Sequence, residues 1–222
     1  MSAASFRALA RQAAALYPAR DRYARHFAFG KLTRDPVFRH IWDNQLIAHG
    51  ATTRVLDLGC GQALIGALLT AGAQPGDWRY QGIDSSRRDI ERARAALPAR
   101  CEMVEADVRA AQLPVSDVVF VIDVLHYIEP DAQADLLRRV REALAPGGVL
   151  VMRVADASPS LRFRYTEAVD VIVTRLRGQA VKRLHSVPLG ERRRQLEGHG
   201  FRVEERPMSE GTPFANVLLV AR

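Results

Sequence analysis

The stretch from Arg54 to Gly66, RVLDLGCGQALIG, constrains the fold of this 222-residue chain more than any other. Its first part, Val55 to Leu58, is a short run of branched apolar residues around an aspartate, as in a buried strand. Gly59 and Gly61 then interrupt the strand pattern, and apolar residues resume at helical spacing from Ala63. A strand, a glycine turn and a helix in this order form the first half of a βαβ unit. The glycines also let a ligand approach the backbone closely.

The details of the turn indicate which ligand it suits. A dinucleotide-binding turn has a third glycine at the position that Leu64 occupies here, whereas Gly66 comes two residues later. Asp57, just before the turn, would repel a pyrophosphate and suits a cationic ligand. The segment VLDLGCG resembles motif I of the class I methyltransferases that depend on S-adenosyl-L-methionine (SAM) and release S-adenosyl-L-homocysteine (SAH). The resemblance implies that Asp57 and the backbone of Gly59, Cys60 and Gly61 bind the methionine part of SAM.

Strand and helix patterns alternate after the turn, which predicts a parallel, doubly wound α/β sheet. The continuous apolar run from Ser116 to Ile122 is typical of a central strand buried on both faces. The resemblance implies a Rossmann-like class I methyltransferase fold with seven strands, mostly parallel, and an antiparallel last strand. The expected strands are 54–58, 78–83, 101–105, 116–122, 149–154, 201–207 and 214–220, with Pro146-Gly147-Gly148 as a turn before the fifth.

Two segments outside this alternation are expected to cover the sheet. Residues 1–50 form three amphipathic helices, predicted at 5–16, 20–31 and 36–48, and precede a SAM-binding domain at 51–222. Asp35-Pro36 reads as an N-cap followed by proline at the first helical position. The second segment is a basic helical insertion at about 156–188. In similar methyltransferases such helices lie over the cofactor and shape the acceptor pocket.

Acidic residues follow the second and third expected strands. Asp84 and the adjacent Ser85 come where this fold, like dinucleotide folds, places an acid for the two ribose hydroxyls. Asp107 and Val108 follow the third strand, and the resemblance implies that they contact adenine, with Ile83 on its other face. A solvated loop acid remains the alternative for Asp84, and a helix N-cap the alternative for Asp107.

The segment Asp123 to Tyr127, DVLHY, follows the fourth strand and corresponds to motif IV. It lacks the Asn/Asp-Pro-Pro-Tyr/Phe signature of nucleic-acid base amino methylation and resembles small-molecule methyltransferases, with Asp123 in the cofactor site. His126 is the candidate catalytic residue, because the ordinary pKa of imidazole suits proton removal at neutral pH. A histidine that packs or hydrogen-bonds beside the cofactor is an equal alternative.

Composition limits the expected cellular location, metal content and partners of the chain. Cys60 and Cys101 fall on different parts of the expected sheet, so we expect no disulfide and a cytoplasmic location. The sequence shows no metal-ligand spacing of His, Cys and Asp, no bilayer-spanning run and no signal peptide, so no metal and no membrane span are expected. The net charge of +7 is carried almost wholly by arginine. It indicates either an anionic partner or a solvated helical surface.

The segment 25–38, RHFAFGKLTRDPVF, also resembles bacterial methyltransferases of aryl polyene and related polyketide pigment pathways. That resemblance implies an aromatic or polyketide-derived acceptor, free or bound to an acidic carrier protein. The sequence therefore favours an enzyme that moves a methyl group from SAM to a small molecule. The alternatives are an RNA or protein methyltransferase that uses the basic surface, although nucleic acid is not the expected partner, and a SAM-binding module without catalysis. The acceptor atom and the oligomeric state are not specified by the sequence.

Overall fold

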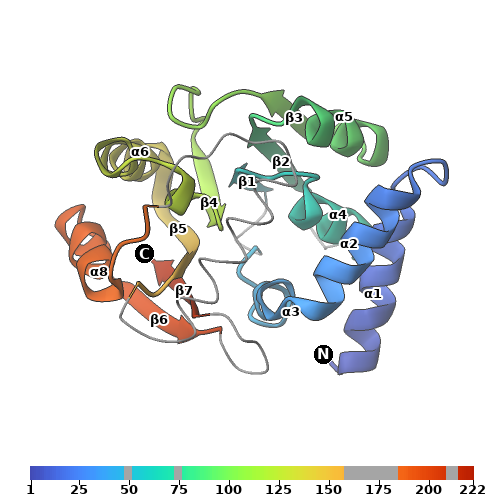
Figure 1. Cartoon of the computed structure of the whole chain (residues 1–222), viewed down its shortest axis with the longest axis horizontal. Helices are drawn as coiled ribbons and strands as arrows, with labels where there is room; N and C mark the ends of the chain where they lie inside the picture. Colours follow the sequence, from blue (N-terminus) through green and yellow to red (C-terminus); the bar gives the residue numbers. More distant parts are fainter. Residues whose placement is uncertain (48–51, 73–76, 158–184, 209–214) are drawn as a thin grey trace.

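A single seven-stranded sheet organises the molecule, here seen in a computed structural model that describes residues 1–47, 52–72, 77–157, 185–208 and 215–222 (Figure 1). Its strand order is β3-β2-β1-β4-β5-β7-β6. Only β7 runs antiparallel to its neighbours, so the predicted mostly parallel sheet with an antiparallel last strand is confirmed. The strands are β1 (Thr52–Leu58), β2 (Asp77–Asp84), β3 (Cys101–Glu105), β4 (Ser116–Ile122), β5 (Leu144–Ala155), β6 (Val203–Pro207) and β7 (Asn216–Ala221).

The chain order of the strands reverses between β1 and β4, which lie side by side in the middle of the sheet. In open parallel sheets, ligands bind at such a switch point, beyond the carboxyl ends of the strands. The first strand ends there at Leu58 and the fourth at Ile122. The glycine turn and the segment that begins with Asp123 therefore emerge next to each other.

Helices cover both faces of the sheet. Apolar residues on one face of the sheet pack against α1 to α5, and those on the other face pack against α6 and α8. Alternate residues of a strand belong to opposite faces, so Val55 joins the first core and Leu56 the second. The helices are α1 (Ala3–Ala15), α2 (Arg22–Arg34), α3 (Pro36–Asp43), α4 (Leu64–Ala71), α5 (Arg87–Ala96), the 3-10 turn η1 (Leu125–Tyr127), α6 (Pro130–Ala143) and α8 (Leu189–Gly198).

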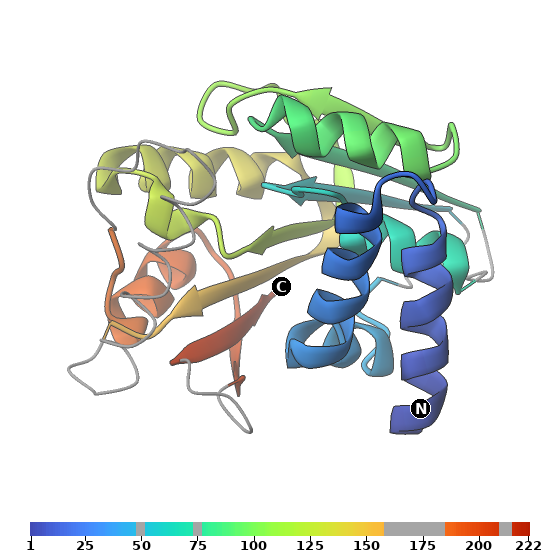
Figure 2. The ribbon, with the colours of Figure 1, turned by 45° about the vertical axis from the view of Figure 1, so that its right-hand side comes forward.

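The N-terminal helices stand beside the carboxyl edge of β1 and β4. Figures 1 and 2 both show α1 and α2 side by side, with α3 at the lower end of α2. Local signals explain the helix ends: Asp21 caps α2 through the backbone N–H of Ala24 at 2.9 Å, and Asp35 caps α3 through that of Val37 at 3.1 Å. Tyr17 fixes this cover to the glycine turn, because its hydroxyl donates to the Gln62 carbonyl at 2.6 Å.

Some expected boundaries differ from the structure. The Pro146-Gly147-Gly148 turn is wrong as a separate element: it lies within β5, where the register against β4 shifts and Gly147 has φ of +76°. Most of the expected basic insertion, residues 158–184, lies outside the described residues. Within the described ranges, no helix is both long and apolar enough to cross a membrane.

We predict that Gly72→Ala destabilises the protein. A Cβ at Gly72 would lie 2.0 Å from the Trp42 ring, so α3 could not keep its contact with the end of α4. Overpacking of this kind costs about 1–3 kcal/mol, measurable by urea denaturation. Gly198→Ala is the matched control, since a Cβ there meets no described atom within 4 Å. Equal unfolding free energies for the two variants would contradict the packing account.

Candidate functional site

The backbone of the glycine turn lies in close contact with the segment that follows β4. Gly59 has φ of +70°, and a Cβ on it would lie 2.2 Å from a Val124 methyl group. Both the torsion and the contact therefore require glycine at this position. The backbone N–H groups of Gly59 and Cys60 donate to the Ile83 carbonyl at 2.7 and 3.1 Å, which joins the turn to the end of β2.

Asp84 lies directly beside this turn. Its Oδ2 accepts from the Gly61 backbone N–H at 2.8 Å, and its Oδ1 accepts from that of Ser86 at 2.7 Å. The carboxylate is thus held at the carboxyl edge of β2 by two backbone donors. A carboxylate has about four acceptor sites, so it retains capacity for further donors.

Asp57 lies beneath the turn and is buried. Tyr80 donates its hydroxyl proton to Asp57 Oδ2 at 2.6 Å. Burial raises the pKa of Asp57 to about 7, the Tyr80 hydrogen bond lowers it, and the negative charge of Asp84 raises it. Near neutral pH this carboxyl group therefore exchanges between its neutral and charged forms.

The expected adenine contacts Asp107 and Val108 follow the carboxyl end of β3. Asp107 accepts the Arg109 backbone N–H at 2.9 Å and forms an ion pair with the Arg109 guanidinium, as a turn-capping acid would. That hydrogen bond and the guanidinium hold its pKa below the usual range, with the side-chain bond the larger cause. Val108 is buried in the same apolar cluster as Ile83.

A cavity of about 850 Å³ opens from the glycine turn toward α2, which is within the size range of small-molecule sites. Among the expected site residues it is lined by Asp57, Gly59, Cys60, Gly61, Asp123 and His126. The expected site residues Asp84, Ser85, Asp107 and Val108 are not part of its lining. The walls also include one face of α2, the starts of α3, α4 and α5, the ends of β4 and β5, and the residues Met208 and Asn216.

An ion-pair cluster around the buried Arg153 lines the cavity at the ends of β4 and β5. Arg153 of β5 is 2% exposed and donates to Asp123 at 2.7 Å and to Asp35 at 2.8 Å. Lys31 lies 2.8 Å from Asp35 and 3.7 Å from Asp123. Burial alone would raise the pKa of both carboxyl groups, but Arg153 outweighs it and holds them below the usual range. Asp123 is therefore a fixed negative charge that cannot take up a proton at neutral pH.

His126 lies in η1, just after β4, and is 9% exposed. Burial and Arg153 lower its pKa, while Asp123 acts in the opposite direction. The imidazole is therefore neutral at physiological pH and able to accept a proton. Gln133 of α6 holds the turn by donating to the carbonyls of Leu125 and Ile128 at 2.9 and 2.7 Å.

Sequence reasoning treated Asp35 only as a cap and Arg153 only as part of a strand, so the cluster was missed. The available signal was Arg153 itself, in the apolar run VLVMRVA of a central strand. A buried arginine in such a strand requires carboxylate partners. Among the described residues, no group of three or more His, Cys, Asp or Glu side chains could hold a metal ion.

We predict that Arg153→Met lowers the free energy of unfolding by about 3 kcal/mol, because Lys31 alone then faces the two carboxylates of Asp35 and Asp123. Their pKa values would then rise above those of the unfolded chain. The variant would therefore regain stability as the pH falls from about 8 to about 5, where these groups protonate. In the parent chain their lowered pKa values have the opposite effect, and stability is lost as the pH falls through them.

Urea denaturation at both pH values measures this difference. The control adds Asp35→Asn and Asp123→Asn to Arg153→Met, and removal of the uncompensated charges should recover part of the loss. A triple variant no more stable than the single variant would contradict the electrostatic account.

Comparisons with known proteins indicate which proteins this chain resembles. A methyltransferase domain family matches residues 55–148. The carboxy-S-adenosyl-L-methionine synthase of Pseudomonas aeruginosa (strain UCBPP-PA14) is 34% identical over 114 residues, which are 46% of this chain and 46% of that protein. The matched region thus spans about half the length of this curated relative.

Solved structures extend the likeness of the fold. An S-adenosylmethionine-dependent methyltransferase from Mesorhizobium loti matches with a TM-score of 0.62 and 24% identity, covering 83% of this chain and 96% of that one. An O-methyltransferase family protein from Burkholderia thailandensis matches with a TM-score of 0.62 and 19% identity over 91% of this chain and 60% of that one. These findings show that residues 55–148 belong to a methyltransferase domain family, and in motif and sheet order the chain resembles the class I SAM-dependent methyltransferases.

Proposed function

We propose that this chain is an enzyme that binds SAM at the carboxyl edge of β1 and β2 and transfers its methyl group to a small-molecule acceptor. The observation that carries the proposal is a single cavity that runs from the glycine turn to the face of α2. A cofactor over the turn would leave space between itself and α2 for a second molecule. A module that only retained SAM would have no use for that space.

The chain's own groups suit the parts of SAM. Asp84, already fixed by Gly61 and Ser86, offers its remaining acceptor sites to the ribose hydroxyls. Asp57 offers a buried carboxylate to the ammonium group. Ile83 and Val108 provide an apolar site for adenine, and the segment that begins with Asp107 provides polar groups at its edge.

When bound, SAM supplies an electrophilic methyl group on a sulfonium. The protein's task is then to hold the acceptor in line with that methyl group, and positioning alone supplies a large part of the rate. His126 is the residue we assign to proton removal from the acceptor, because it is neutral and lies at the cavity wall. Asp123 is a poor candidate for that role, because Arg153 holds its pKa below the usual range and so makes it a weak proton acceptor.

The acceptor we propose is aromatic or polyketide-derived, either free or delivered by a carrier protein. The aromatic residues Phe27 and Tyr127 in the cavity wall support this choice. RNA or protein substrates remain alternatives on the ground of the net charge. The name of the curated relatives supports one further candidate, in which the chain produces a carboxylated SAM.

Incubation with methyl-labelled SAM and a panel of acceptors tests the proposal. We expect SAH together with a labelled small molecule. Carboxylated SAM, formed when a carboxyl donor is added to the incubation, would point to the relatives' reaction, and label on added RNA or protein would point to a macromolecular substrate. Failure of calorimetry to detect SAM or SAH binding at millimolar ligand would refute the proposal altogether.

We predict that Asp84→Ala weakens SAH binding by about tenfold or more, because the ribose hydroxyls and the turn lose a charged acceptor. Isothermal titration calorimetry measures the affinity. Glu102→Gln, which removes an exposed carboxylate of β3 away from the cavity, should leave it unchanged. An unaltered affinity in Asp84→Ala would remove Asp84 from the cofactor site.

We also predict that SAH binding at about pH 7 releases protons. Asp57 is partly protonated there, since its pKa is about 7, and a neighbouring ammonium group favours the charged carboxylate. Calorimetry in two buffers with different ionisation enthalpies measures the number of protons released. Asp57→Asn should abolish the release attributed to this group, and persistence of the full release in that variant would place the ammonium elsewhere.

A further inference from the structure

One face of α2 lines the cavity and is not used by the cofactor residues described above. Its residues recur every three or four positions, which places them on the same side of the helix. This cavity face of α2 consists of Tyr23, His26, Phe27, Gly30, Lys31 and Arg34. It is therefore both aromatic and basic.

Gly30 in the middle of α2 has no packing explanation in the described part of the chain. Glycine inside a helix costs about 1 kcal/mol relative to alanine. A Cβ on Gly66 would lie 3.1 Å from Leu97 and Tyr80, and one on Gly72 would strike Trp42, so these glycines allow close packing. A Cβ on Gly30 meets no described atom within 4 Å. Because Gly30 lines the cavity, its missing side chain leaves a notch in the cavity wall.

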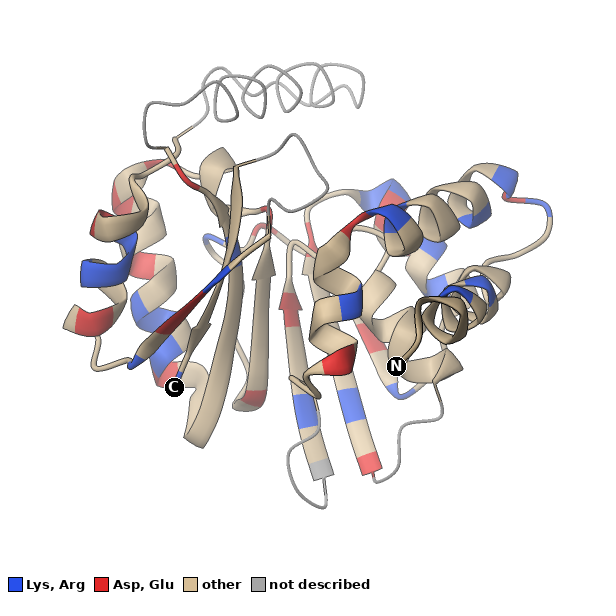
Figure 3. Cartoon of the chain, turned by 90° about the horizontal axis from the view of Figure 1, so that it is seen from below, with Lys and Arg blue, Asp and Glu red and all other residues tan. Residues whose placement is uncertain are grey.

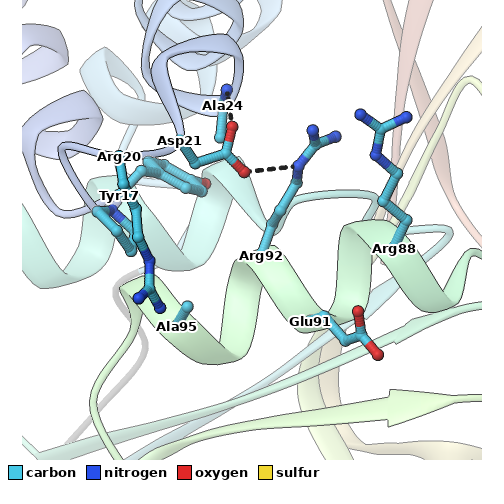
Figure 4. A pocket seen from close by; sticks show the side chains of 9 residues that line it. Tyr17, Arg20, Asp21, Ala24, Arg88, Glu91, Arg92 and Ala95 are labelled. Carbon is cyan, nitrogen blue, oxygen red and sulfur yellow. Dashed lines mark hydrogen bonds and ion pairs between the residues drawn. The ribbon is translucent and has the colours of Figure 1, made fainter.

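Aromatic rings flank this notch on its N-terminal side. The rings of Tyr23 and Phe27 are stacked, with centroids 6.0 Å apart and planes 11° from parallel. The guanidinium groups of Arg88 and Arg92 lie 5.9 and 4.7 Å from the centroid of the Tyr23 ring. Figure 4 shows Arg88 and Arg92 on α5, facing the start of α2, where Arg92 is paired with Asp21. These contacts fix the Tyr23 ring although it is 54% exposed.

The charges of the cavity wall are unequally compensated. Asp35 and Asp123 pair with Arg153, Asp89 accepts from Gln62 and Arg92, and Asp57 accepts from Tyr80. Arg34 and Arg88 line the same cavity, yet no ion pair joins either one to a carboxylate within the described ranges.

The surroundings reinforce this positive potential. Residues 1–50 contain eight basic and three acidic residues, so most of the net charge of +7 lies in the N-terminal segment. Basic positions recur along the helices beside the N-terminus in Figure 3. Bound SAM adds a further net positive charge, since it carries a sulfonium, an ammonium and one carboxylate. A neutral acceptor would leave this charge without a partner.

We propose that the cavity face of α2 is a subsite for a planar aromatic acceptor that carries a carboxylate. The ring lies in the notch at Gly30 against Phe27, and the carboxylate pairs with Arg34. The inference deepens the proposed function, because it assigns the substrate class of the same site and depends on a cofactor bound over the glycine turn.

Three soluble probes test the subsite by calorimetry on the SAH-saturated protein. Para-hydroxybenzoate has both the ring and the charge, para-hydroxybenzamide has only the ring, and cyclohexanecarboxylate has only the charge. We expect para-hydroxybenzoate to bind about fivefold more tightly than either of the others. Arg34→Gln should remove the advantage over the amide and leave the amide itself unaffected.

Gly30→Ala tests the notch independently of charge. The added methyl group should weaken both aromatic probes by about tenfold. It should raise the melting temperature, because alanine favours the helix and meets no described atom. Gly198→Ala, in α8 and outside the cavity, is the matched control and should leave probe binding unchanged. The SAH affinity should be the same in all three variants.

The proposal is overturned if the amide binds as tightly as the carboxylate, if Gly30→Ala leaves the affinity for both aromatic probes unaltered, or if none of the probes binds at millimolar concentration. Loss of SAH binding by the unsubstituted protein would instead refute the proposed function. The two failures are therefore distinguishable in the same set of titrations.

Discussion

The contact of Arg153 with Asp35 and Asp123 joins parts of the chain that are 118 and 30 residues apart in sequence. It connects the N-cap of α3, the residue that follows β4 and the carboxyl end of β5. Asp35 serves two purposes at once, since the same side chain caps α3 and accepts from Arg153. The position of the N-terminal helices over the sheet therefore depends on a buried arginine that has carboxylates on both sides.

This cluster also determines the electrostatics of the cavity. Lys31 and Arg153 balance the negative charges of the acids in this cluster. The cavity face of α2 contributes further basic groups. Asp57 differs from Asp35 and Asp123, because its partner is the neutral hydroxyl of Tyr80 and its pKa is about 7. Asp35 and Asp123 thus stay charged at neutral pH whereas Asp57 titrates there, and the difference follows from their partners.

Local patterns were sufficient to predict the elements of the sheet. The strands Cys101–Glu105 and Ser116–Ile122 have the predicted bounds, since apolar periodicity and turn residues act over a few positions. The glycine turn was predictable for the same reason. The start of β5 could not be predicted in this way. Its pairing with β4 includes Leu144, ahead of Pro146, and the register then shifts, which the local sequence does not indicate.

The site was less predictable than the sheet, because its contacts are made between distant segments. The acid Asp84 was expected at the end of β2, but its hydrogen bond to Gly61 depends on how the turn folds back. Asp35 was visible as a cap, yet nothing near it in sequence indicates Arg153 as its partner. Gly30 lies within a predicted helix, and only the cavity beside it gives a role to its missing side chain.

The most direct test of the account is a crystal structure of the full chain with SAH. The account predicts SAH over the turn from Gly59 to Gly61, with its ribose hydroxyls on Asp84 and its sulfur facing the cavity face of α2. SAH bound away from this edge of the sheet, or with its sulfur turned away from α2, would contradict it.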